Sequence, residues 1–556
     1  MSTGYLANSK TALNSAAEFS AGAQPALSDR FDVVVVGGGA VGCAVAWEAA
    51  SRGLHTALLE RDDFGAATSA NSLRIVHGGL RYLQTLNLRR ARASSKERAI
   101  MLRIAPHLVS PLECVVPTFR SLKRGRMAFA VGLGINRLLT VGHNQMLAAS
   151  HRLGAGGIIS EAKLAQRAPG LAMKDVTGGA RWFDGCMTSG ERLALAFALS
   201  AREQGAVVLN HVEVERALTR GGRISGVAAR DALSGESLEL AAKVVLDCRG
   251  FGLSSQPTLF GDPGFELEFV KAVNIILGDQ GLECAVGAPS RDARGDPVPG
   301  RMIFACPVEQ TTVVGTWYFS QDSTSQEIVP GELEAILQVV NGAFPGWHVT
   351  PDDVLRLHVG FLPRGNATGI EPLPIERPIL SDSAAMGGLQ GLWHVQTEKW
   401  TTVRALAERS VSLLAQVEDL SAAPSRTHEQ SLVGGGPVSL SADQSTLLAT
   451  LSTRQSSRIT SHYGSRAGIV LNYILKGPSL AKPVPAAPAI IQGELSYVLD
   501  HELVRSPKDM VRRIAPDQTD ALAPETVAFL TEFMSARRDL SHARQQDEFE
   551  DLQTER

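Results

Sequence analysis

Cysteine is scarce in this sequence, and no two cysteines have the CxxC spacing of a redox or zinc-binding motif. A scattered set of this kind is typical of reduced thiols in a cytosolic protein and argues against a disulfide framework. We therefore expect the cysteines to pack as apolar side chains, and we expect no metal site. Their positions are Cys43, Cys114, Cys186, Cys248, Cys284 and Cys306.

The sequence also lacks an excess of charge of either sign and lacks long hydrophobic runs. Its formal net charge is -3, whereas a protein that binds nucleic acid normally carries a basic excess or a concentrated basic face. No stretch approaches the roughly 20 continuous apolar residues that a membrane-spanning helix needs. Residues 1–30 lack the apolar core of a secretory signal. These absences predict a cytoplasmic protein that neither binds nucleic acid nor crosses a membrane.

One stretch leaves a peripheral membrane contact open. Arg120, Lys123, Arg124 and Arg126 immediately precede an apolar segment that runs to Leu139. Such a combination could rest on an anionic bilayer at the inner membrane face. The alternative, which we favour, is a solvated basic turn that leads into a buried helix.

Strand and helix patterns alternate from Phe31 to about Ala422, which is typical of an α/β fold. With 44% hydrophobic residues, the chain is long enough for more than one core. A connector rich in Ser, Gly and Pro follows. Beyond it, apolar residues at helical spacing predict a small helical domain in which Ser506 and Pro507 open one helix. The predicted parts are a mobile tail (1–30), an interleaved two-domain region (31–422), a linker (423–444), a C-terminal helical domain (445–540) and a charged tail (541–556).

A glycine-rich motif follows the first predicted strand. The β-branched residues Val33–Val36 lead into Gly37-x-Gly39-x-x-Gly42, and an apolar helical pattern follows. The first glycine permits a tight turn, the second lets backbone N–H groups approach a pyrophosphate, and the third lets helix and strand pack closely. The next predicted strand ends at Glu60, where a carboxylate can accept hydrogen bonds from ribose hydroxyls. Together these features predict a dinucleotide site, without separating NAD from FAD.

Beyond the glycine motif, the sequence resembles the aerobic, FAD-dependent glycerol-3-phosphate dehydrogenase family, within the broader group of D-amino-acid-oxidase-like FAD oxidoreductases. The resemblance is carried by "RDDFGAATSANSLRIVHGGLRYLQTLNLRRA", "GGARWFDGCMTSGERLALAFALSAREQGAVVLNHVEV", "EKWTTVRALAERSV" and the C-terminal "LSYVLDHELVRSPKDMVRRI". It covers the chain from Asp32 to about Ile514. It implies a Rossmann-like FAD-binding domain interleaved with a mixed-sheet substrate domain, whose second sheet draws its strands from about 105–171 and 265–381.

The resemblance also implies FAD as a non-covalent cofactor, together with the residues around it. In the family, a loop of Thr and Ser followed by His-Gly-Gly-Leu-Arg-Tyr-Leu wraps the flavin. The helix after Lys-x-Thr-Thr points its N-terminus at the flavin ring and stabilises negative charge there. The hydroxyls could instead cap helices, and His77 is expected to hold its loop in place. The implied cofactor-binding residues are Gly37, Gly39, Gly42, Glu60, Arg61, Thr68, Ser69, Ser72, Arg74, His77, Gly78, Val212, Gly250, Thr401 and Thr402.

The presumed substrate pocket departs from the family pattern. Asn274 stands where the family has a histidine that faces the substrate, and an amide cannot act as a general base. Leu362 occupies the position of one phosphate-binding arginine, with Arg364 displaced along the chain, whereas Arg377 keeps the position of the second. Thr397–Glu398 replaces a double glycine. Because these changes cluster at the pocket while the dinucleotide motif is intact, we expect the cofactor to be kept and the substrate to be altered.

A cationic pocket can still assemble from the remaining residues. A guanidinium fork pairs two oxygens of a phosphate or carboxylate, and lysine adds a point charge. Arg364 could instead be exposed to solvent, and His358 could be a spare base or, as we favour, a buried histidine with its hydrogen bonds satisfied. The predicted catalytic residues are Arg81, Tyr82, Asn274, Arg364, Arg377 and Lys399.

The resemblance implies an oxidoreductase that acts on a small anionic hydroxy compound, a polyol phosphate or a hydroxy acid. A hydride would pass from the substrate carbon to flavin N5, and the hydroxyl proton to a base or to water. Quinone or oxygen would reoxidise the flavin. Two alternatives stay open, an amine or amino-acid oxidase of the same fold and a non-catalytic FAD-binding protein. The sequence also leaves a homodimer open.

Overall fold

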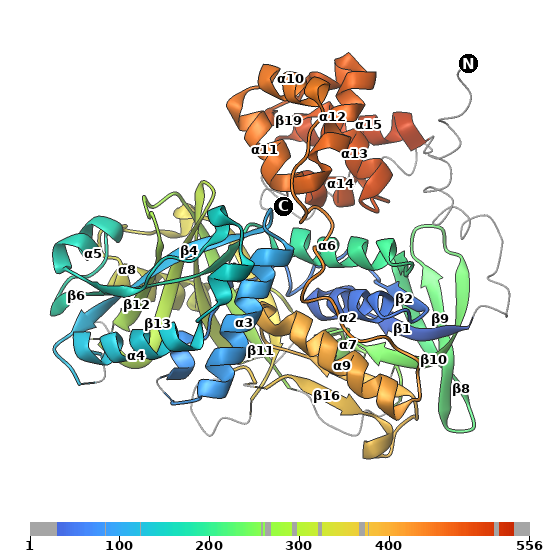
Figure 1. Ribbon diagram of the computed structural model, residues 1–556, viewed down its shortest axis with the longest axis horizontal. Coiled ribbons are helices and arrows are strands. Elements are labelled where there is room, and N and C mark those ends of the chain that lie inside the picture. The colour runs from blue at the N-terminus through green and yellow to red at the C-terminus, as the bar shows by residue number, and fades with distance from the viewer. Residues whose placement is uncertain are drawn as a thin grey trace.

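The computed structural model contains two large β-sheets with their helices and a separate C-terminal group of helices that includes a two-stranded sheet (Figure 1). It describes residues 30–538 except 84, 123, 257–258, 262–267, 292–296, 321–324, 366–372, 376 and 516–521. Apart from Arg30, the two predicted tails lie outside the described residues. Both sheets draw strands from distant parts of the chain, which confirms that the two domains are interleaved.

The first sheet has a parallel centre around the strand that precedes the glycine motif. β1 (Phe31–Val36) pairs in parallel with β2 (Thr56–Leu59) on one side and with β10 (Ser237–Asp247) on the other. Parallel strands end at one edge of a sheet, so the residues that follow these three strands meet there. The other strands are β7 (Val207–Leu209), β16 (Ile379–Asp382), β17 (Leu392–Gln396), and the hairpin of β8 (Val212–Arg220) and β9 (Arg223–Asp231).

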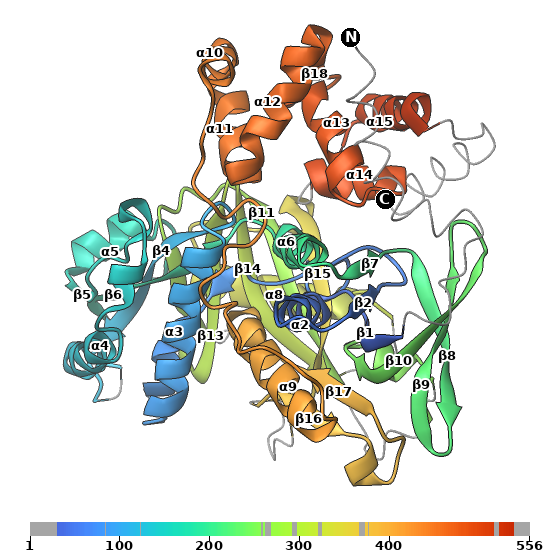
Figure 2. The same cartoon turned by 45° about the vertical axis from the view of Figure 1, so that its right-hand side comes forward.

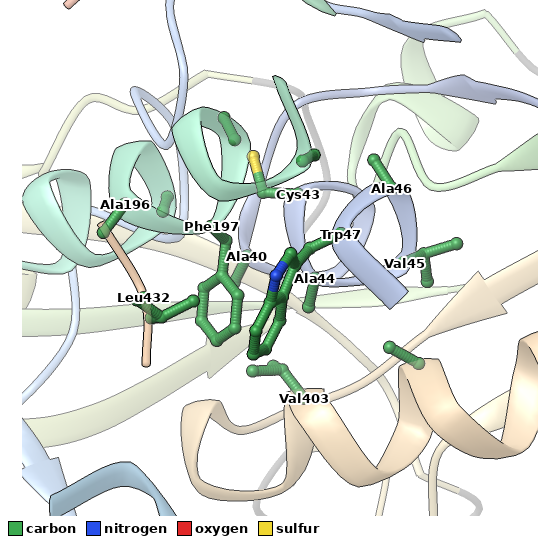
Figure 3. Packing of buried hydrophobic residues seen from close by; sticks show 14 of the residues in the cluster. Ala40, Cys43, Ala44, Val45, Ala46, Trp47, Ala196, Phe197, Val403 and Leu432 are labelled. Atoms are coloured by element: carbon green, nitrogen blue, oxygen red, sulfur yellow. The ribbon is translucent and has the colours of Figure 1, made fainter. Parts of the chain in front are cut away.

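Three helices cover one face of this sheet. α2 (Ala40–Ser51) is apolar on nearly all sides and is accordingly buried between the sheet, α6 (Gly190–Glu203) and α9 (Val403–Val417). Trp47 of α2 packs against Phe197 of α6, with ring centroids 5.4 Å apart (Figure 3). Large aromatic side chains bury more surface than any others, so this core fixes the direction in which the N-terminus of α2 points.

The second sheet is mixed, with the order β15-β11-β14-β13-β12-β4-β6-β3 and β5 beside β6. β3 and β6 lie outside the expected ranges 105–171 and 265–381, and β16 lies inside them but pairs in the first sheet. Strand periodicity shows that a segment is a strand but does not show which sheet it joins. The strands are β3 (Ile75–Val76), β4 (Val109–Phe119), β5 (Gly157–Ile159), β6 (Val176–Met187), β11 (Phe269–Gly278), β12 (Ala285–Arg291), β13 (Pro297–Val308), β14 (Thr311–Ser320) and β15 (Val354–Pro363).

The remaining helices of the interleaved region surround the second sheet or connect the two sheets. α8 packs on the sheet through Ile336, Leu337 and Val340. The α-helices are α3 (Leu88–Ile104), α4 (Arg126–Leu139), α5 (Glu161–Arg167), α7 (Gly252–Ser255) and α8 (Pro330–Ala343). The short 3-10 helices are η1 (Leu80–Leu83), η2 (His143–Met146), η3 (Ala149–His151), η4 (Pro351–Asp353), η5 (Ala384–Met386) and η6 (Trp400–Thr402).

The helix that follows the basic stretch is exposed, so the expectation of a buried helix is wrong. α4 buries only Leu133, whereas Met127, Val131 and Leu138 leave 78%, 59% and 73% of their surface exposed. α4 lies against β5, β6, η1 and α3. A segment that is apolar on several sides therefore leaves apolar side chains in solvent, which its composition alone does not reveal.

The C-terminal residues form the predicted helical domain, which stands on the interleaved region beside α6 (Figure 1 and Figure 2). Residues 418–441, between α9 and this domain, form no helix or strand. Ser506 caps α14 and Pro507 is its first residue, as predicted. The elements are α10 (Ala442–Thr450), α11 (Thr453–Tyr463), η7 (Gly464–Arg466), α12 (Ala467–Lys476), η8 (Pro478–Ala481), β18 (Pro483–Val484), β19 (Ala487–Ile491), α13 (Gln492–His501), α14 (Pro507–Ile514) and α15 (Pro524–Arg538).

All six cysteines are buried and free, as predicted from their scattered spacing. Burial raises the pKa of the Cys43 and Cys248 thiols, beside the glycine motif, well above their usual range. They therefore act as apolar packing residues. Among the described residues, no helix has the length and apolar composition needed to cross a bilayer.

Candidate active site

The glycine motif forms the turn between β1 and α2 that its spacing predicts. Gly37 has φ 101°, and a Cβ there would lie 2.8 Å from the Cα of Arg249. A Cβ on Gly42 would lie 1.8 Å from the carbonyl oxygen of Gly37, so strand and helix touch where only glycine fits. Gly39 is the N-cap of α2. The N-terminus of α2 therefore faces the carboxyl edge of the first sheet, the place where α/β folds bind phosphate groups.

Glu60 follows β2 directly, as predicted. Its Oε2 accepts a hydrogen bond from the N–H of Gly38 at 2.5 Å, and its Oε1 accepts one from the N–H of Asp62 at 2.8 Å. Burial raises the pKa of Glu60, although the two hydrogen bonds oppose this. Each oxygen keeps a lone pair for a ribose hydroxyl. Of the two other predicted residues here, Arg61 is exposed beside Asp62, and Val212 donates its N–H to the Glu60 carbonyl at 2.8 Å.

The Thr-Ser loop joins the start of α2 to the second sheet. The hydroxyl of Ser69 accepts a hydrogen bond from the N–H of Ala40 at 2.9 Å, which satisfies a donor in the first turn of the helix. The hydroxyl of Thr68 donates to the carbonyl of Phe361 at 3.2 Å and accepts from its N–H at 2.9 Å. The loop therefore lies between the phosphate-binding turn and β15, as a loop that wraps a cofactor between the two domains would.

Two further predicted residues of the loop, Ser72 and Arg74, form hydrogen bonds that hold its end. Arg74 has φ 66° and is buried, and its guanidinium donates to the carbonyl of Thr188 at 2.6 Å. The hydroxyl of Ser72 accepts from the N–H of Arg74 at 3.4 Å. At the end of β10, Gly250 has φ 60°, and a Cβ there would meet no atom within 4 Å. The cofactor-binding roles of Ser72, Arg74 and Gly250 stay predictions.

The His-Gly-Gly segment is held by buried charges and by η6. The N–H of Gly78 donates to Oδ1 of Asp184 at 2.6 Å, and Arg98 donates to the same oxygen at 2.8 Å. A Cβ on Gly78 would lie 2.1 Å from the Arg98 guanidinium, so only glycine fits. The N–H of His77 donates to the hydroxyl of Thr401 at 3.0 Å. These contacts are those of a loop fixed in one position.

Lys399 and Tyr82, two of the predicted substrate residues, lie together. The Lys399 ammonium group donates to the hydroxyl of Tyr82 at 3.1 Å and to that of Ser94 at 3.0 Å. The guanidinium of Arg90 lies over the Tyr82 ring, 4.3 Å from its centroid, and pairs with Glu398 at 3.1 Å. Burial raises the pKa of the Glu398 carboxyl. We call these five residues the Lys399 cluster.

Arg81 is exposed on η1, next in the chain to Tyr82 of this cluster. Burial raises the pKa of Tyr318 on β14, and the charges of Arg81 and Glu398 act on it in opposite directions. Because Arg81 neighbours Tyr82, it adds a positive charge beside the Lys399 cluster.

Two predicted arginines show no contact with the Lys399 cluster. Arg364 pairs with Glu268 at 2.9 Å and is 41% exposed in its side chain, at the far end of β15. This matches the solvent-exposed alternative for Arg364, because a surface carboxylate satisfies its charge. Arg377 is exposed in the segment that precedes β16. Its role in anion binding stays a prediction.

Asn274 is buried, and its amide is fully engaged. Its Nδ2 donates to the carbonyl of Asn71 at 3.1 Å, and its Oδ1 accepts from the hydroxyl of Thr316 at 2.7 Å. On the neighbouring strand, His358 lies opposite Asn274. The expectation that both ring nitrogens of His358 are satisfied is wrong, because its Nδ1 is buried with no hydrogen-bond partner among the described residues. Burial holds the pKa of His358 well below its usual range, so the ring is neutral.

Sequence reasoning missed a charged group at the carboxyl edge of the first sheet. Asp247 ends β10 and pairs with Arg249 at 2.8 Å and with His394 of β17 at 3.4 Å. Burial opposes the charge of Asp247, but hydrogen bonds from His394 and Arg249 outweigh burial and lower its pKa to about 2. The acid at the end of the strand pattern "KVVLD" could have indicated this charged group. The Asp247–Arg249 pair holds the backbone of Arg249, which lies against Gly37.

These features define the class of protein. A βαβ unit with a glycine turn, an acid after its second strand and a helix N-terminus at the sheet edge is a dinucleotide-binding fold, here joined to a second, mixed sheet. FAD fits this chain: a Cβ on Gly39 would make a tight contact of 3.2 Å with the Ser69 hydroxyl at the helix N-terminus, and the Glu60 carboxylate lies at the same turn, 2.5 Å from the N–H of Gly38.

Comparison with known proteins gives the family. The profile of "FAD dependent oxidoreductase" matches residues 32–413, and that of "C-terminal domain of alpha-glycerophosphate oxidase" matches residues 425–544. The chain belongs to the FAD-dependent oxidoreductase family, and FAD is its cofactor. The resemblance predicted from the sequence is thereby confirmed.

Individual relatives are glycerol-3-phosphate dehydrogenases. The chain is 32% identical to the mitochondrial enzyme of Mus musculus over 73% of its own length and 55% of that protein. It is 28% identical to the enzyme of Synechocystis sp. over 87% of the chain and 88% of the relative. The solved structure of the Bacillus halodurans enzyme complexed with FAD superposes with a TM-score of 0.73 at 25% identity, covering 98% of this chain and 97% of that one. The chain therefore spans only about half of the mouse relative.

Proposed function

We propose that this chain oxidises the hydroxyl-bearing carbon of a small anionic polyol phosphate or hydroxy acid. The observation that supports this most is the Lys399 cluster, an ammonium group held by two hydroxyls directly before α9. When bound, FAD supplies the hydride acceptor. Lys399 supplies a point charge and Arg81 a planar fork of donors, and both suit phosphate or carboxylate oxygens.

The cluster is rigid enough to orient a substrate. Tyr82 is held at its hydroxyl by Lys399 and over its ring by Arg90. Two contacts on one aromatic side chain leave it little freedom, and a preorganised site loses less entropy when it binds. Oxidation of an alcohol also releases the hydroxyl proton. Because the Asn274 amide cannot take it up, the proton passes to water or to another base.

Glu398 supports an altered substrate. Its carboxylate lies in the same cluster as Lys399 and pairs with Arg90, so the Arg90 guanidinium is already engaged by an acid. A carboxylate in the pocket opposes a compact phosphate dianion, because like charges placed together cost several kcal/mol at an interface, on the order of 2–3. We therefore propose that glycerol 3-phosphate, the substrate in the names of the relatives, is oxidised poorly, and that a larger or differently shaped anion is preferred.

Substitution of the arginines tests the anion pocket. Arg81→Ala and Arg377→Ala should each lower kcat/KM on the preferred substrate by about tenfold or more, because a charge-assisted hydrogen bond contributes about 1.5–3 kcal/mol. Arg364→Ala is the matched control. Since Arg364 already pairs with Glu268 at the surface, it should change kcat/KM by less than about threefold. If Arg81→Ala and Arg377→Ala both match the parent, the anion pocket is wrong.

Two other functions remain alternatives to be tested against this proposal. An amine or amino-acid oxidase would reduce its flavin with amino substrates rather than hydroxy substrates. A non-catalytic FAD-binding protein would reduce its flavin with neither. Quinone and oxygen are the proposed electron acceptors, and their reactivity with the reduced protein separates a dehydrogenase from an oxidase. A homodimer is tested by the mass of the protein in solution.

We also propose a cytoplasmic location with peripheral attachment to the inner membrane face through α4. Leu122, Met127, Val131 and Leu138 are exposed apolar side chains, and basic residues precede the helix in the sequence. An amphipathic helix of this kind binds a bilayer by burying its apolar side, while the basic residues contact anionic headgroups. Binding to anionic vesicles, described in the Discussion, tests this attachment.

A further inference from the structure

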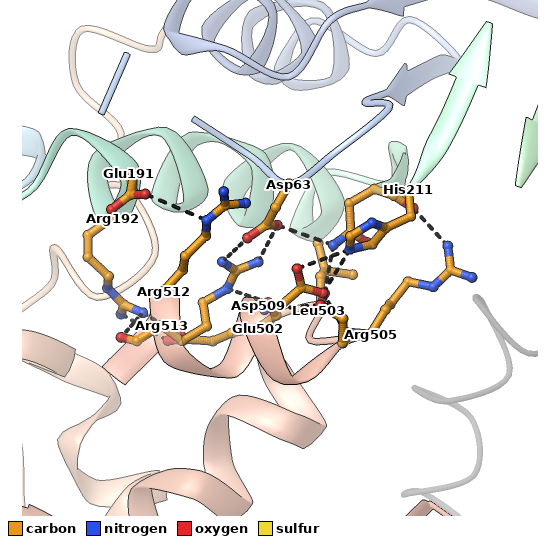
Figure 4. A network of polar contacts seen from close by, with 12 residues as sticks. Asp63, Glu191, Arg192, His211, Glu502, Leu503, Arg505, Asp509, Arg512 and Arg513 are labelled. Carbon is orange, nitrogen blue, oxygen red and sulfur yellow. Dashed lines mark hydrogen bonds and ion pairs between the residues drawn. The ribbon is translucent and has the colours of Figure 1, made fainter. Parts of the chain in front are cut away.

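The segment that follows Glu60 is bound by the C-terminal helical domain. Asp63 is fully buried, and its carboxylate accepts two hydrogen bonds from the guanidinium of Arg513, on α14, at 2.5 and 2.7 Å (Figure 4). The two residues are 450 positions apart in the sequence. A bidentate carboxylate–guanidinium pair is the most directional ion pair that proteins form. It fixes residues 60–63 against the C-terminal domain.

The same domain also holds the strand corner against which this segment lies. The corner is Asn210–His211, between β7 and β8. The N–H of His211 donates to the carbonyl of Asp62 at 2.8 Å. From the other side, Arg505 donates to the carbonyl of Asn210 at 2.7 Å, and the His211 ring contacts Asp509 at 2.9 Å (Figure 4). Both backbone segments around Glu60 therefore depend on residues 503–513.

Loss of the Arg513 guanidinium would displace Glu60, because it would leave the nearby Asp63 carboxylate without its charge partner. Without the guanidinium, Asp63 would be a buried carboxylate whose remaining partner is the amide of Asn210 at 3.2 Å. A buried charge without a partner is strongly unfavourable, so the carboxylate would move toward water or take up a proton. Either response displaces residues 60–63, and with them the Glu60 carboxylate that spans to Gly38.

We propose that Arg513 is a positioning residue for the cofactor: the C-terminal helical domain holds the Glu60–Asp63 segment and so sets the affinity for FAD. The proposal rests on the proposed role of Glu60 as the ribose acceptor. Coupling between two sites is reciprocal. FAD binding therefore also strengthens the docking of the C-terminal domain on the FAD-binding domain.

The test measures FAD binding to the full-length apoprotein by quenching of flavin fluorescence. Arg513→Met should raise the Kd for FAD about tenfold or more, and Arg513→Lys should raise it less. The matched control is Arg202→Met. Arg202 lies on α6 and donates to the carbonyl of His501 at 2.6 Å across the same interface, and among the described residues it shows no hydrogen bond with Asp63, Glu502 or Arg513. It should leave the Kd within about threefold of the parent value.

A second readout reports docking without reference to FAD affinity. Residues 418–441 connect the two parts and form no helix or strand, so a protease should cut there when the C-terminal domain undocks. FAD should slow this cleavage in the parent and in Arg202→Met, but not in Arg513→Met. The double variant Asp63→Asn, Arg513→Met has no unpaired charge at this contact. It is measured in place of Arg513→Met if that single variant does not fold.

The outcomes separate the inference from the proposed function. If Arg513→Met binds FAD as tightly as the parent, or if Arg202→Met weakens FAD binding equally, the positioning role is wrong. If FAD does not slow cleavage of the parent, the reciprocal coupling is wrong. If Glu60→Gln alone keeps parental FAD affinity while Arg513→Met loses it, the ribose role of Glu60 fails, and Arg513 acts on FAD by another route.

Discussion

At the scale of single residues, Glu60 has the clearest consequence. It stands directly after β2, spans to the N–H of Gly38 and keeps lone pairs for a ligand. Its position was predictable because an acid after the second strand of a βαβ unit is a local pattern. The contact of Asp63 with Arg513 was not predictable, because nothing in either local sequence indicates a partner 450 positions away.

Glu60→Ala should weaken FAD binding by about tenfold or more. The loss of hydrogen bonds to a charged acceptor costs about 1.5–3 kcal/mol. The flavin retained after extensive dialysis measures the effect. Asp62→Ala is a suitable control, because its side chain is exposed and lies beside Glu60 without reaching the turn. A Glu60→Ala protein that stays as yellow as the parent would contradict the assignment.

His211 gives the protein a defined pH dependence. Burial disfavours its charged form, but the hydrogen bond and charge of Asp509 outweigh burial and raise the pKa of His211 above 6.5. The pKa of Asp509 is lowered to about 2 despite burial, with His211 as the main cause. A raised histidine pKa stabilises the fold fully below the unfolded value of 6.5, and this stability is lost as pH rises through the folded pKa.

The expected result is a pH-dependent gap between the parent and His211→Asn. The parent should unfold at higher denaturant concentration than the variant at pH 5–6, and the gap should narrow as pH rises above the folded pKa. Asp63, Arg505 and Asp509 also act on the ring, and all are present in both proteins. A gap that stays constant from pH 5 to pH 9 would show that His211 does not titrate in this way.

At the scale of helices and strands, the sequence predicted where a helix begins but did not predict which of its side chains other elements would bury. Ser506 and Pro507 begin α14 because capping and fixed φ act within one turn. By contrast, the apolar residues of α4 are exposed, although their composition indicated burial. Burial depends on what packs against a helix, and the sequence of the helix alone does not contain that information.

The exposed side of α4 should bind anionic vesicles in a salt-dependent manner. Vesicles of phosphatidylglycerol should retain the protein at low salt and release it at high salt, because charges at a surface are screened within about 10 Å at 0.1 M. Replacing Arg124 and Arg126 with Ser should weaken binding at low salt. Met127→Ser with Val131→Ser should weaken it at every salt concentration. Absence of binding at low salt would reject the attachment.

At the scale of the whole molecule, the fold was predictable, but the assembly of the pocket was predictable only in part. The glycine motif predicted a dinucleotide-binding domain because it acts through local backbone geometry, and the family resemblance carried by the His-Gly-Gly-Leu-Arg-Tyr-Leu segment implied that the dinucleotide is FAD. The sequence also predicted Tyr82 and Lys399, which the fold brings to 3.1 Å. It did not predict that Arg364 would pair with Glu268, because that contact depends on how β11 and β15 align.

The most direct test of the account is anaerobic reduction of the bound flavin, followed through its visible absorption band. Anionic hydroxy compounds should bleach the band, with larger anionic polyols faster than glycerol 3-phosphate. Glu398→Gln should lower the KM for glycerol 3-phosphate by about tenfold, equivalent to about 1.4 kcal/mol. Neither amino compounds nor uncharged polyols should bleach it. Bleaching by amino compounds alone, bleaching by no compound, or efficient oxidation of glycerol 3-phosphate by the unaltered protein would contradict the account.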